Sequence, residues 1–144
     1  MNYIKKKTIF VFVGDGPEKL SLKKYAEKLS IVHNIRFEGR LNPVNGLSDW
    51  YSLADIFDLP SLSEGRPMVI NEAMASECAI IASNISGIPE QVKDGYNGYL
   101  IEPKDYNALA EKIEFLLNND TMLEMMCKNS RKRVLEKDWS WQGY

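Results

Sequence analysis

One stretch of the chain decides the fold: Ser61-Leu62-Ser63-Glu64-Gly65-Arg66-Pro67-Met68-Val69-Ile70-Asn71-Glu72-Ala73-Met74-Ala75. Gly65 favours a turn and Pro67 suits the first position of a helix, so the stretch predicts a helix that begins at about Pro67. Glu64 falls just before this helix, and Glu72 falls inside it, roughly 7–8 Å further along the axis. The helix N-terminus between these carboxylates carries unpaired N–H groups and a partial positive charge, which suit a phosphate.

Two carboxylates that flank such a helix end can grip the two ends of one elongated ligand. An ionised carboxylate accepts hydrogen bonds from both hydroxyls of a sugar diol. The order carboxylate, anion site, carboxylate therefore fits a nucleotide diphosphate sugar. Each acid alone also has a simpler interpretation: Glu64 as an acid placed favourably beside a helix N-terminus, and Glu72 as an exposed helix residue.

The chain alternates strand and helix patterns along its length. A continuous apolar run predicts a strand at 8–13, and further short strands are predicted at 34–38, 56–59, 79–82 and 98–101. Helical patterns fall at 17–30, 47–52, 67–76, 87–93, 105–118 and 121–137. Such alternation predicts an α/β fold with a doubly wound parallel sheet. At 144 residues we expect a single domain over residues 1–144.

Four loops follow predicted strand ends and should share one edge of the sheet, where α/β folds bind their ligands. They are the loops at 14–17, 39–40, 61–65 and 84–87. Gly14 and Gly16 let backbone approach a ligand, but glycines at strand ends also serve turns with positive φ. The sequence favours a turn with a ligand-facing role.

Six segments, taken in order over about residues 8–118, resemble the C-terminal, donor-binding domain of GT-B fold retaining glycosyltransferases, in particular glycosyltransferase family 4 of the group 1 type. The stretch from Glu64 to Glu72 resembles the E-x(7)-E motif of that family. The other segments are Ile9-Phe10-Val11-Phe12-Val13-Gly14-Asp15-Gly16-Pro17, Ile35-Arg36-Phe37-Glu38-Gly39, Ala54-Asp55-Ile56-Phe57-Asp58-Leu59-Pro60-Ser61, Ile80-Ile81-Ala82-Ser83, and Gly87-Ile88-Pro89-Glu90 with Asp94-Gly95-Tyr96-Asn97-Gly98.

The resemblance implies the Rossmann-like half of a GT-B fold and the donor-binding part of an enzyme of polysaccharide biosynthesis. Such an enzyme transfers a sugar from a nucleotide diphosphate sugar to a glycan or lipid-linked acceptor. It implies no cofactor and no metal, since the nucleotide sugar is a substrate. By resemblance, Glu64 is catalytic and meets hydroxyls of the donor sugar, while Glu72 binds the ribose diol. The other donor-binding residues that the resemblance implies are Gly65, Arg66, Pro67 and Met68 at the phosphates, Gly14 and Gly16 near the nucleotide, and Gly39 with Arg40 at the base.

Compared with that family, the chain lacks an earlier strand that carries phosphate-clamping Arg and Lys residues, and it lacks the acceptor domain. Trp139-Ser140-Trp141 resembles the motif before the family's last helix. We therefore expect a fragment truncated at both ends, incomplete at its N-terminus and inactive alone. It would close its sheet by pairing 8–13 with 56–59, or by self-association, or through a partner that supplies the missing half.

Composition excludes several function classes. A net charge of −2 argues against nucleic-acid binding. Two cysteines, Cys78 and Cys127, form no disulfide framework, and together with the single His33 they offer no metal-ligand spacing, so a cytoplasmic protein is expected. The basic residues at 128 and 131–133 fit either a solvated helix face or a peripheral contact with the inner face of the membrane.

Two rival functions stay open. One is a non-catalytic nucleotide-binding or assembly module that needs a partner chain. The other is an epimerase of the GT-B fold, although such enzymes use further acids and histidines, and His33 is the only histidine in the chain.

Overall fold

The computed structural model describes residues 7–42 and 44–137. Lys5, Lys6 and the Trp139-Ser140-Trp141 motif lie outside the described residues. The chain divides into two compact units, a smaller unit over Lys6–Ser48 and a larger unit that begins at Asp49. Each unit is a small α/β assembly with parallel strands.

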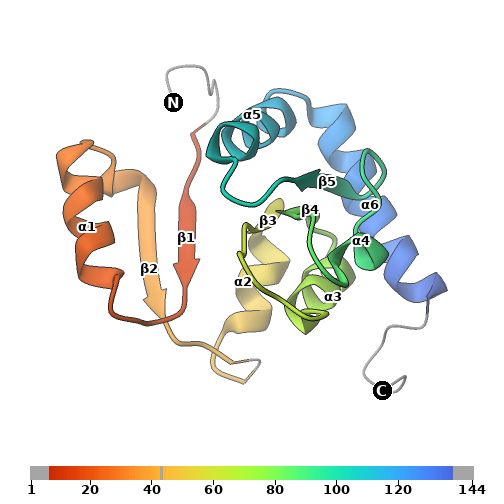
Figure 1. Ribbon diagram of the computed structural model, residues 1–144, viewed down its shortest axis with the longest axis horizontal. Helices are drawn as coiled ribbons and strands as arrows, with labels where there is room; N and C mark the ends of the chain where they lie inside the picture. The colour runs from red at the N-terminus through yellow and green to blue at the C-terminus, as the bar shows by residue number, and fades with distance from the viewer. Residues whose placement is uncertain (1–6, 43, 138–144) are drawn as a thin grey trace. The chain divides into compact units, whose positions relative to one another are not determined.

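The smaller unit contains β1 (Phe10–Val13), α1 (Lys19–Lys28), a 3-10 turn η1 (Val32–Asn34) and β2 (Ile35–Gly39) (Figure 1). β1 and β2 pair in parallel, with Phe10 opposite Ile35. The rings of Phe12 and Phe37 stack with centroids 5.3 Å apart. These two paired strands are the ones that the sequence predicted at 8–13 and 34–38.

The larger unit carries the remaining strands and the Glu64–Glu72 stretch. Its elements are β3 (Ile56–Leu59), α3 (Met68–Ala75), β4 (Ala79–Ser83), α4 (Ile88–Gln91), β5 (Gly98–Ile101), α5 (Tyr106–Leu117) and α6 (Asp120–Glu136), preceded by α2 (Leu47–Leu53), which spans the boundary between the units. The three strands are parallel in the order β3-β4-β5. Gly98 is required where β5 meets β4, because a Cβ on it would lie 1.8 Å from the carbonyl oxygen of Ile80.

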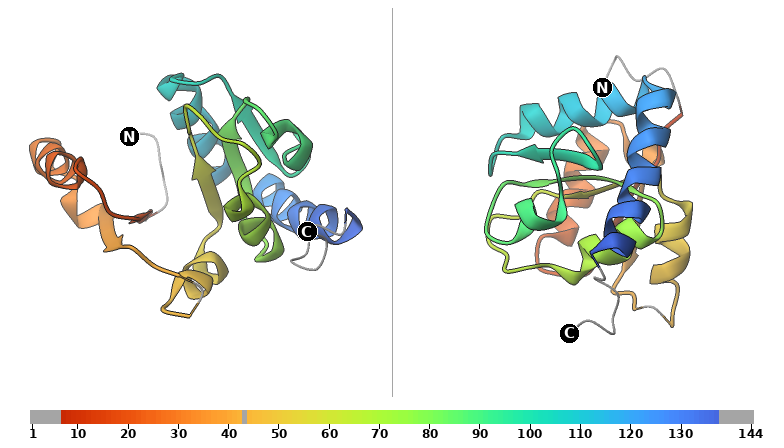
Figure 2. Two further views of the ribbon diagram at one scale, coloured as in Figure 1. Left: turned by 60° about the horizontal axis from the view of Figure 1, so that its bottom comes forward. Right: turned by 90° about the vertical axis from the view of Figure 1, so that its right-hand side faces the viewer.

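The core of the larger unit lies around its central strand. Every residue of β4 is buried, so both of its faces are covered. Ala79 and Ile81 pack with Leu116 of α5 and Met126 of α6, and Figure 2 shows these helices against the sheet. The loop after β3, which carries Glu64, leads from this packed sheet into α3.

The predicted α/β class and the order of strands and helices are confirmed. Pro67, however, is the N-cap of α3 rather than its first helical residue, since its ψ of 123° is extended. The described strands form two parallel sheets, one in each unit. Pairing of 8–13 with 56–59 would join the units and stays a prediction, as does a single domain over residues 1–144.

Candidate functional site

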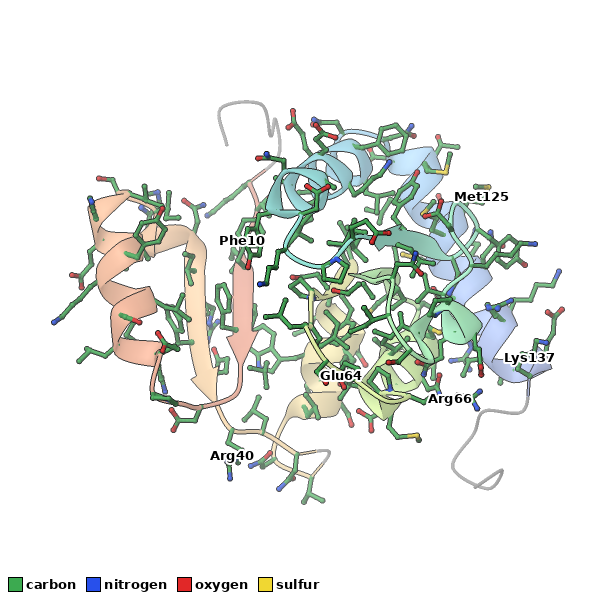
Figure 3. The ribbon with its side chains drawn as sticks, in the orientation of Figure 1. Phe10, Arg40, Glu64, Arg66, Met125 and Lys137 are labelled. Carbon is green, nitrogen blue, oxygen red and sulfur yellow. The ribbon has the colours of Figure 1, made fainter. Side chains whose placement is uncertain are left out.

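Glu64 lies on the loop between β3 and α3, where Figure 3 labels it together with Arg66. Its side chain is half-buried, and Ser61 Oγ donates a hydrogen bond to Glu64 Oε1 over 2.8 Å. The bond orients the carboxylate at the entrance to the helix. The second carboxylate oxygen can then accept hydrogen bonds from a ligand.

Glu72 lies in the second turn of α3 and is also half-buried. Tyr51 of α2 donates its hydroxyl to Glu72 Oε2 over 3.1 Å. Burial, and after it the charge of Glu72, raises the pKa of the Tyr51 hydroxyl, so this group stays a protonated donor. Sequence reasoning missed Tyr51 because nothing in its neighbourhood along the chain links it to the motif.

The N-terminus of α3 separates the two carboxylates. Its N-cap, Pro67, brings no side-chain oxygen to the first turn, so no side chain of the cap competes for those N–H groups. The predicted residues Gly65, Arg66 and Met68 therefore lie on or beside an uncapped helix start. Such a helix end binds anions through backbone N–H groups and the helix dipole.

A buried amide holds this helix start in place. Gln91, at the end of α4, is fully buried, and its Nε2 donates to the Pro67 carbonyl over 2.9 Å and to Asn71 Oδ1 over 2.8 Å. Arg133 of α6 donates in turn to the carbonyls of Gln91 and Glu90, over 2.9 and 2.8 Å. The first turn of α3 is thus tied to α4 and, through α4, to α6.

The loop after β4 meets the loop after β3, as the shared edge predicted. Gly87 N–H donates to the Gly65 carbonyl over 3.0 Å, and a Cβ on Gly87 would lie 3.2 Å from Arg66 Cβ. Arg66 Nη1 lies 4.0 Å from Glu90 Oε2. Close contact with Gly87 positions the stem of Arg66, while its guanidinium is partly exposed beside a carboxylate.

The smaller unit brings its own predicted residues together. Gly14 N–H donates to the Gly39 carbonyl over 2.6 Å. A turn with positive φ was predicted at Gly14 and Gly16; Gly14 has it, with φ of +131°, whereas Gly16 is not among the residues with positive φ, and Gly39, for which no turn was predicted, has φ of +70°. Gly16 N–H donates a hydrogen bond to the carboxylate of Asp15. Arg40 is exposed. A shallow pocket of about 230 Å³ is lined by Phe12, Val13, Gly14, Asp15, Gly16, Pro17, Glu18, Lys19, Leu22 and Phe37.

Lys19 is a pocket residue that sequence reasoning missed. Its Nζ lies 3.9 Å from Asp15 Oδ1, and equally far from where a Cβ on Gly39 would be. Gly14, Gly16, Gly39 and Arg40 belong to one unit, whereas Glu64 to Glu72 belong to the other. That both groups form one binding edge stays a prediction.

The family profile described as glycosyl transferases group 1 matches residues 2–133. The chain belongs to the group 1 glycosyltransferases. A glycosyltransferase of Haemophilus influenzae is 36% identical over 88% of this chain and 35% of its own length. The UDP-Gal:alpha-D-GlcNAc-diphosphoundecaprenol alpha-1,3-galactosyltransferase of Escherichia coli is 32% identical over 89% of this chain and 32% of its own length. The chain thus spans about a third of the length of these curated relatives.

Two solved structures agree with this assignment. The C-terminal domain of the group 1 glycosyl transferase LpcC from Francisella tularensis is 25% identical, with a TM-score of 0.79, covering 91% of this chain and 85% of that domain. TarM of Staphylococcus aureus, solved as a variant with fondaparinux, alpha-GlcNAc-glycerol and UDP, is 26% identical, with a TM-score of 0.80, covering 90% of this chain and 26% of its own. The expected C-terminal domain of a GT-B group 1 glycosyltransferase is confirmed.

Across residues 7–42 and 44–137, no three His, Cys, Asp or Glu side chains are grouped so that they could hold a metal ion. Within the same ranges, no helix has the length and apolar character needed to cross a bilayer.

The basic residues of α6 engage neighbouring protein groups. Lys128 pairs with Glu124 at 2.8 Å, and Lys132 Nζ lies 3.9 Å from Glu136. Arg131 Nη1 donates to the Ala75 carbonyl over 2.6 Å. Arg133 donates to the carbonyls of Glu90 and Gln91, so each of these four basic side chains lies beside an acidic side chain or donates to a backbone carbonyl.

Proposed function

We propose that this chain is the nucleotide-sugar-binding part of a retaining glycosyltransferase. The parent enzyme transfers a sugar from a nucleotide diphosphate sugar to a glycan or lipid-linked acceptor. The observation that carries the proposal is the uncapped N-terminus of α3 between the oriented carboxylates of Glu64 and Glu72. Two relatives support it: the Escherichia coli relative is named as a galactosyltransferase that uses UDP-Gal and a diphosphoundecaprenol acceptor, and TarM is solved with UDP.

Glu64 and Glu72 take different parts of the donor in this proposal. Glu64 accepts hydrogen bonds from hydroxyls of the sugar, and Glu72 accepts them from the ribose diol. The N-terminus of α3, with Gly65, Pro67 and Met68, faces the diphosphate. Pro67 contributes no N–H, so the phosphate would be bound by its neighbours.

The first turn of α3 also serves the chemistry. As the acceptor oxygen bonds to the anomeric carbon, the bond to the phosphate oxygen breaks, and the leaving phosphate takes the acceptor proton on the same face of the sugar. Negative charge grows on that phosphate, so preorganised N–H groups and the helix dipole stabilise the transition state more than the ground state. Arg66, if it turns from Glu90 to the phosphate, adds a cation there.

The smaller unit would contact the nucleotide. Gly14 and Gly16 offer backbone beside it, and Gly39 with Arg40 offers groups for the base. No cofactor takes part, because the nucleotide sugar is itself the donor.

Activity is expected to need more than this chain. We propose that residues 1–144 alone bind donor but transfer no sugar, and that a partner or self-association supplies the missing half. We also propose peripheral contact with the inner face of the membrane. The basic residues of α6 already interact with acids and backbone carbonyls of the protein, so these residues give that contact no support. The rival function is a module that binds nucleotide without catalysis. Both functions include nucleotide binding, and only the transferase also transfers the sugar.

Calorimetry on the full chain tests the binding step with UDP and GDP sugars. Glu72→Ala removes hydrogen bonds to a charged acceptor, worth roughly 1.5–3 kcal/mol, so affinity should fall about ten- to a hundredfold. Glu111→Ala, at an exposed acid of α5, is the matched control. Unchanged affinity for both nucleotide classes in Glu72→Ala would reject the ribose role.

Transfer of radiolabelled sugar tests the second step. The chain alone should show none, and transfer should appear with the partner or in the complete enzyme. Turnover by a purified monomer would contradict the expected need for a missing half. Donor binding without transfer under any pairing would favour the non-catalytic module.

A further inference from the structure

One side chain outside the motif touches a motif carboxylate directly. The Tyr51 hydroxyl lies 3.1 Å from Glu72 Oε2, although the two residues are 21 positions apart in the chain. Tyr51 is 7% exposed, its ring packs edge-on against Phe57 with centroids 5.7 Å apart, and its carbonyl accepts a hydrogen bond from Cys78 Sγ over 3.3 Å. Burial, the ring contact and the backbone hydrogen bond together hold Tyr51 in place beside Glu72.

We propose that Tyr51 is a positioning residue that orients the Glu72 carboxylate for the ribose diol and so sets the preference for nucleotides that carry both ribose hydroxyls. This inference rests on the proposed function, which gives Glu72 the ribose. It adds the residue that fixes the carboxylate, Tyr51.

The physical argument begins with the freedom of a glutamate side chain. A half-buried Glu72 without a partner would sample several rotamers and lose that freedom on binding. The Tyr51 bond fixes the side chain before the ligand arrives, which lowers the cost of binding. Since a carboxylate offers about four acceptor positions, Glu72 can keep the Tyr51 bond and still accept from two ribose hydroxyls.

The nature of the donor also matters. Tyr51 is neutral, so it orients the Glu72 carboxylate without cancelling its negative charge. A lysine or arginine in its place would cancel that charge. In the part of the chain that the structure describes, no ion pair is recorded for Glu72. A neutral donor leaves the carboxylate negatively charged, and hydrogen bonds to a charged acceptor are the stronger kind.

The test compares UDP with 2′,3′-dideoxy-UDP, which lacks both ribose hydroxyls. Calorimetry on the full chain uses the wild type, Tyr51→Phe, Glu72→Ala and the double variant. Tyr51→Phe should weaken UDP binding about fivefold, as expected for a lost hydrogen bond. It should leave dideoxy-UDP binding within about twofold, and it should cost nothing further in the Glu72→Ala background, since the two residues act as one unit.

The control is Tyr99→Phe, which removes a hydroxyl from a partly buried tyrosine of β5 whose ring packs against Phe115. It should change neither affinity. Melting curves verify that each variant folds, and Tyr51→Phe keeps the ring that contacts Phe57. A merely structural role would lower both affinities in parallel, so the ratio of the two separates positioning from general support.

The outcomes separate the inference from the function on which it rests. Equal losses for UDP and dideoxy-UDP, or no loss for UDP, overturn the role of Tyr51 while Glu72→Ala still weakens UDP binding. A wild type that binds both ligands equally, with no effect of Glu72→Ala, overturns the ribose site itself.

Discussion

Replacement of Gln91 by Met tests how strongly the buried amide holds the start of α3. The side chain keeps its approximate length and loses both donated hydrogen bonds, at 2.9 Å to the Pro67 carbonyl and 2.8 Å to Asn71 Oδ1. A typical intramolecular hydrogen bond contributes about 0.5–1.5 kcal/mol, so two contribute about 1–3 kcal/mol. Gln91 Oε1 is itself buried without a partner among the described residues, and its removal offsets part of the loss. We expect a net destabilisation of about 1–2 kcal/mol.

Urea unfolding and thermal melting of the full chain measure this change. For a chain of this size, 1 kcal/mol corresponds to a Tm shift of about 2–4 °C, so Tm should fall by roughly 2–8 °C. The control is Asn107→Met, which makes an amide-to-apolar change at an exposed position of α5 and should stay within about 0.5 kcal/mol of the wild type. A Gln91→Met protein as stable as that control would refute the reasoning, since it would mean that the two bonds contribute nothing net.

Three further changes have definite expected results. Gly98→Ala places a methyl group 1.8 Å from the Ile80 carbonyl oxygen, so urea unfolding should show a loss of about 3 kcal/mol or more; a loss below about 1 kcal/mol would contradict the tight β4–β5 contact. Asp105→Ala removes the N-cap bond to the Ala108 N–H at 3.0 Å and should cost about 1 kcal/mol in the same assay, whereas no change would show that the cap is dispensable. Burial raises the pKa of the Cys78 thiol to about 12, above its unfolded value of about 8.5, so unfolding titrations should show stability falling as pH rises through that window; a fall equally steep in Cys78→Ala would assign it to other groups.

The elements of this fold were predictable because each one has a local signature. Each described strand was predicted to within two or three residues, and Ile56–Leu59 and Gly98–Ile101 were predicted with their observed bounds. The 3-10 turn at Val32–Asn34 was missed, since three residues carry no periodicity. Pro67 was placed one position too far into its helix, because proline fixes φ but leaves ψ to its surroundings.

The candidate site was predictable only where it is contiguous in the chain. Glu64 and Glu72 share one short segment whose spacing has a physical meaning. Tyr51 lies 21 residues from the carboxylate it contacts, and Arg133 lies 42 residues from the Gln91 carbonyl it binds. Contacts over such separations depend on how helices pack on the sheet. This packing produces no regular spacing of residues along the sequence, so the sequence alone does not predict these contacts.

The bonds from Arg133 to α4 determine how short a recombinant piece of this chain can be if it is to keep the N-terminus of α3 in place. A shorter recombinant piece that stopped at the end of α5 would contain every predicted donor-binding residue, yet it would expose the carbonyls of Glu90 and Gln91 that the guanidinium now satisfies. Minimal binding domains, chimaeras and split reporters derived from this protein should therefore extend through Arg133, about sixty residues beyond Glu72.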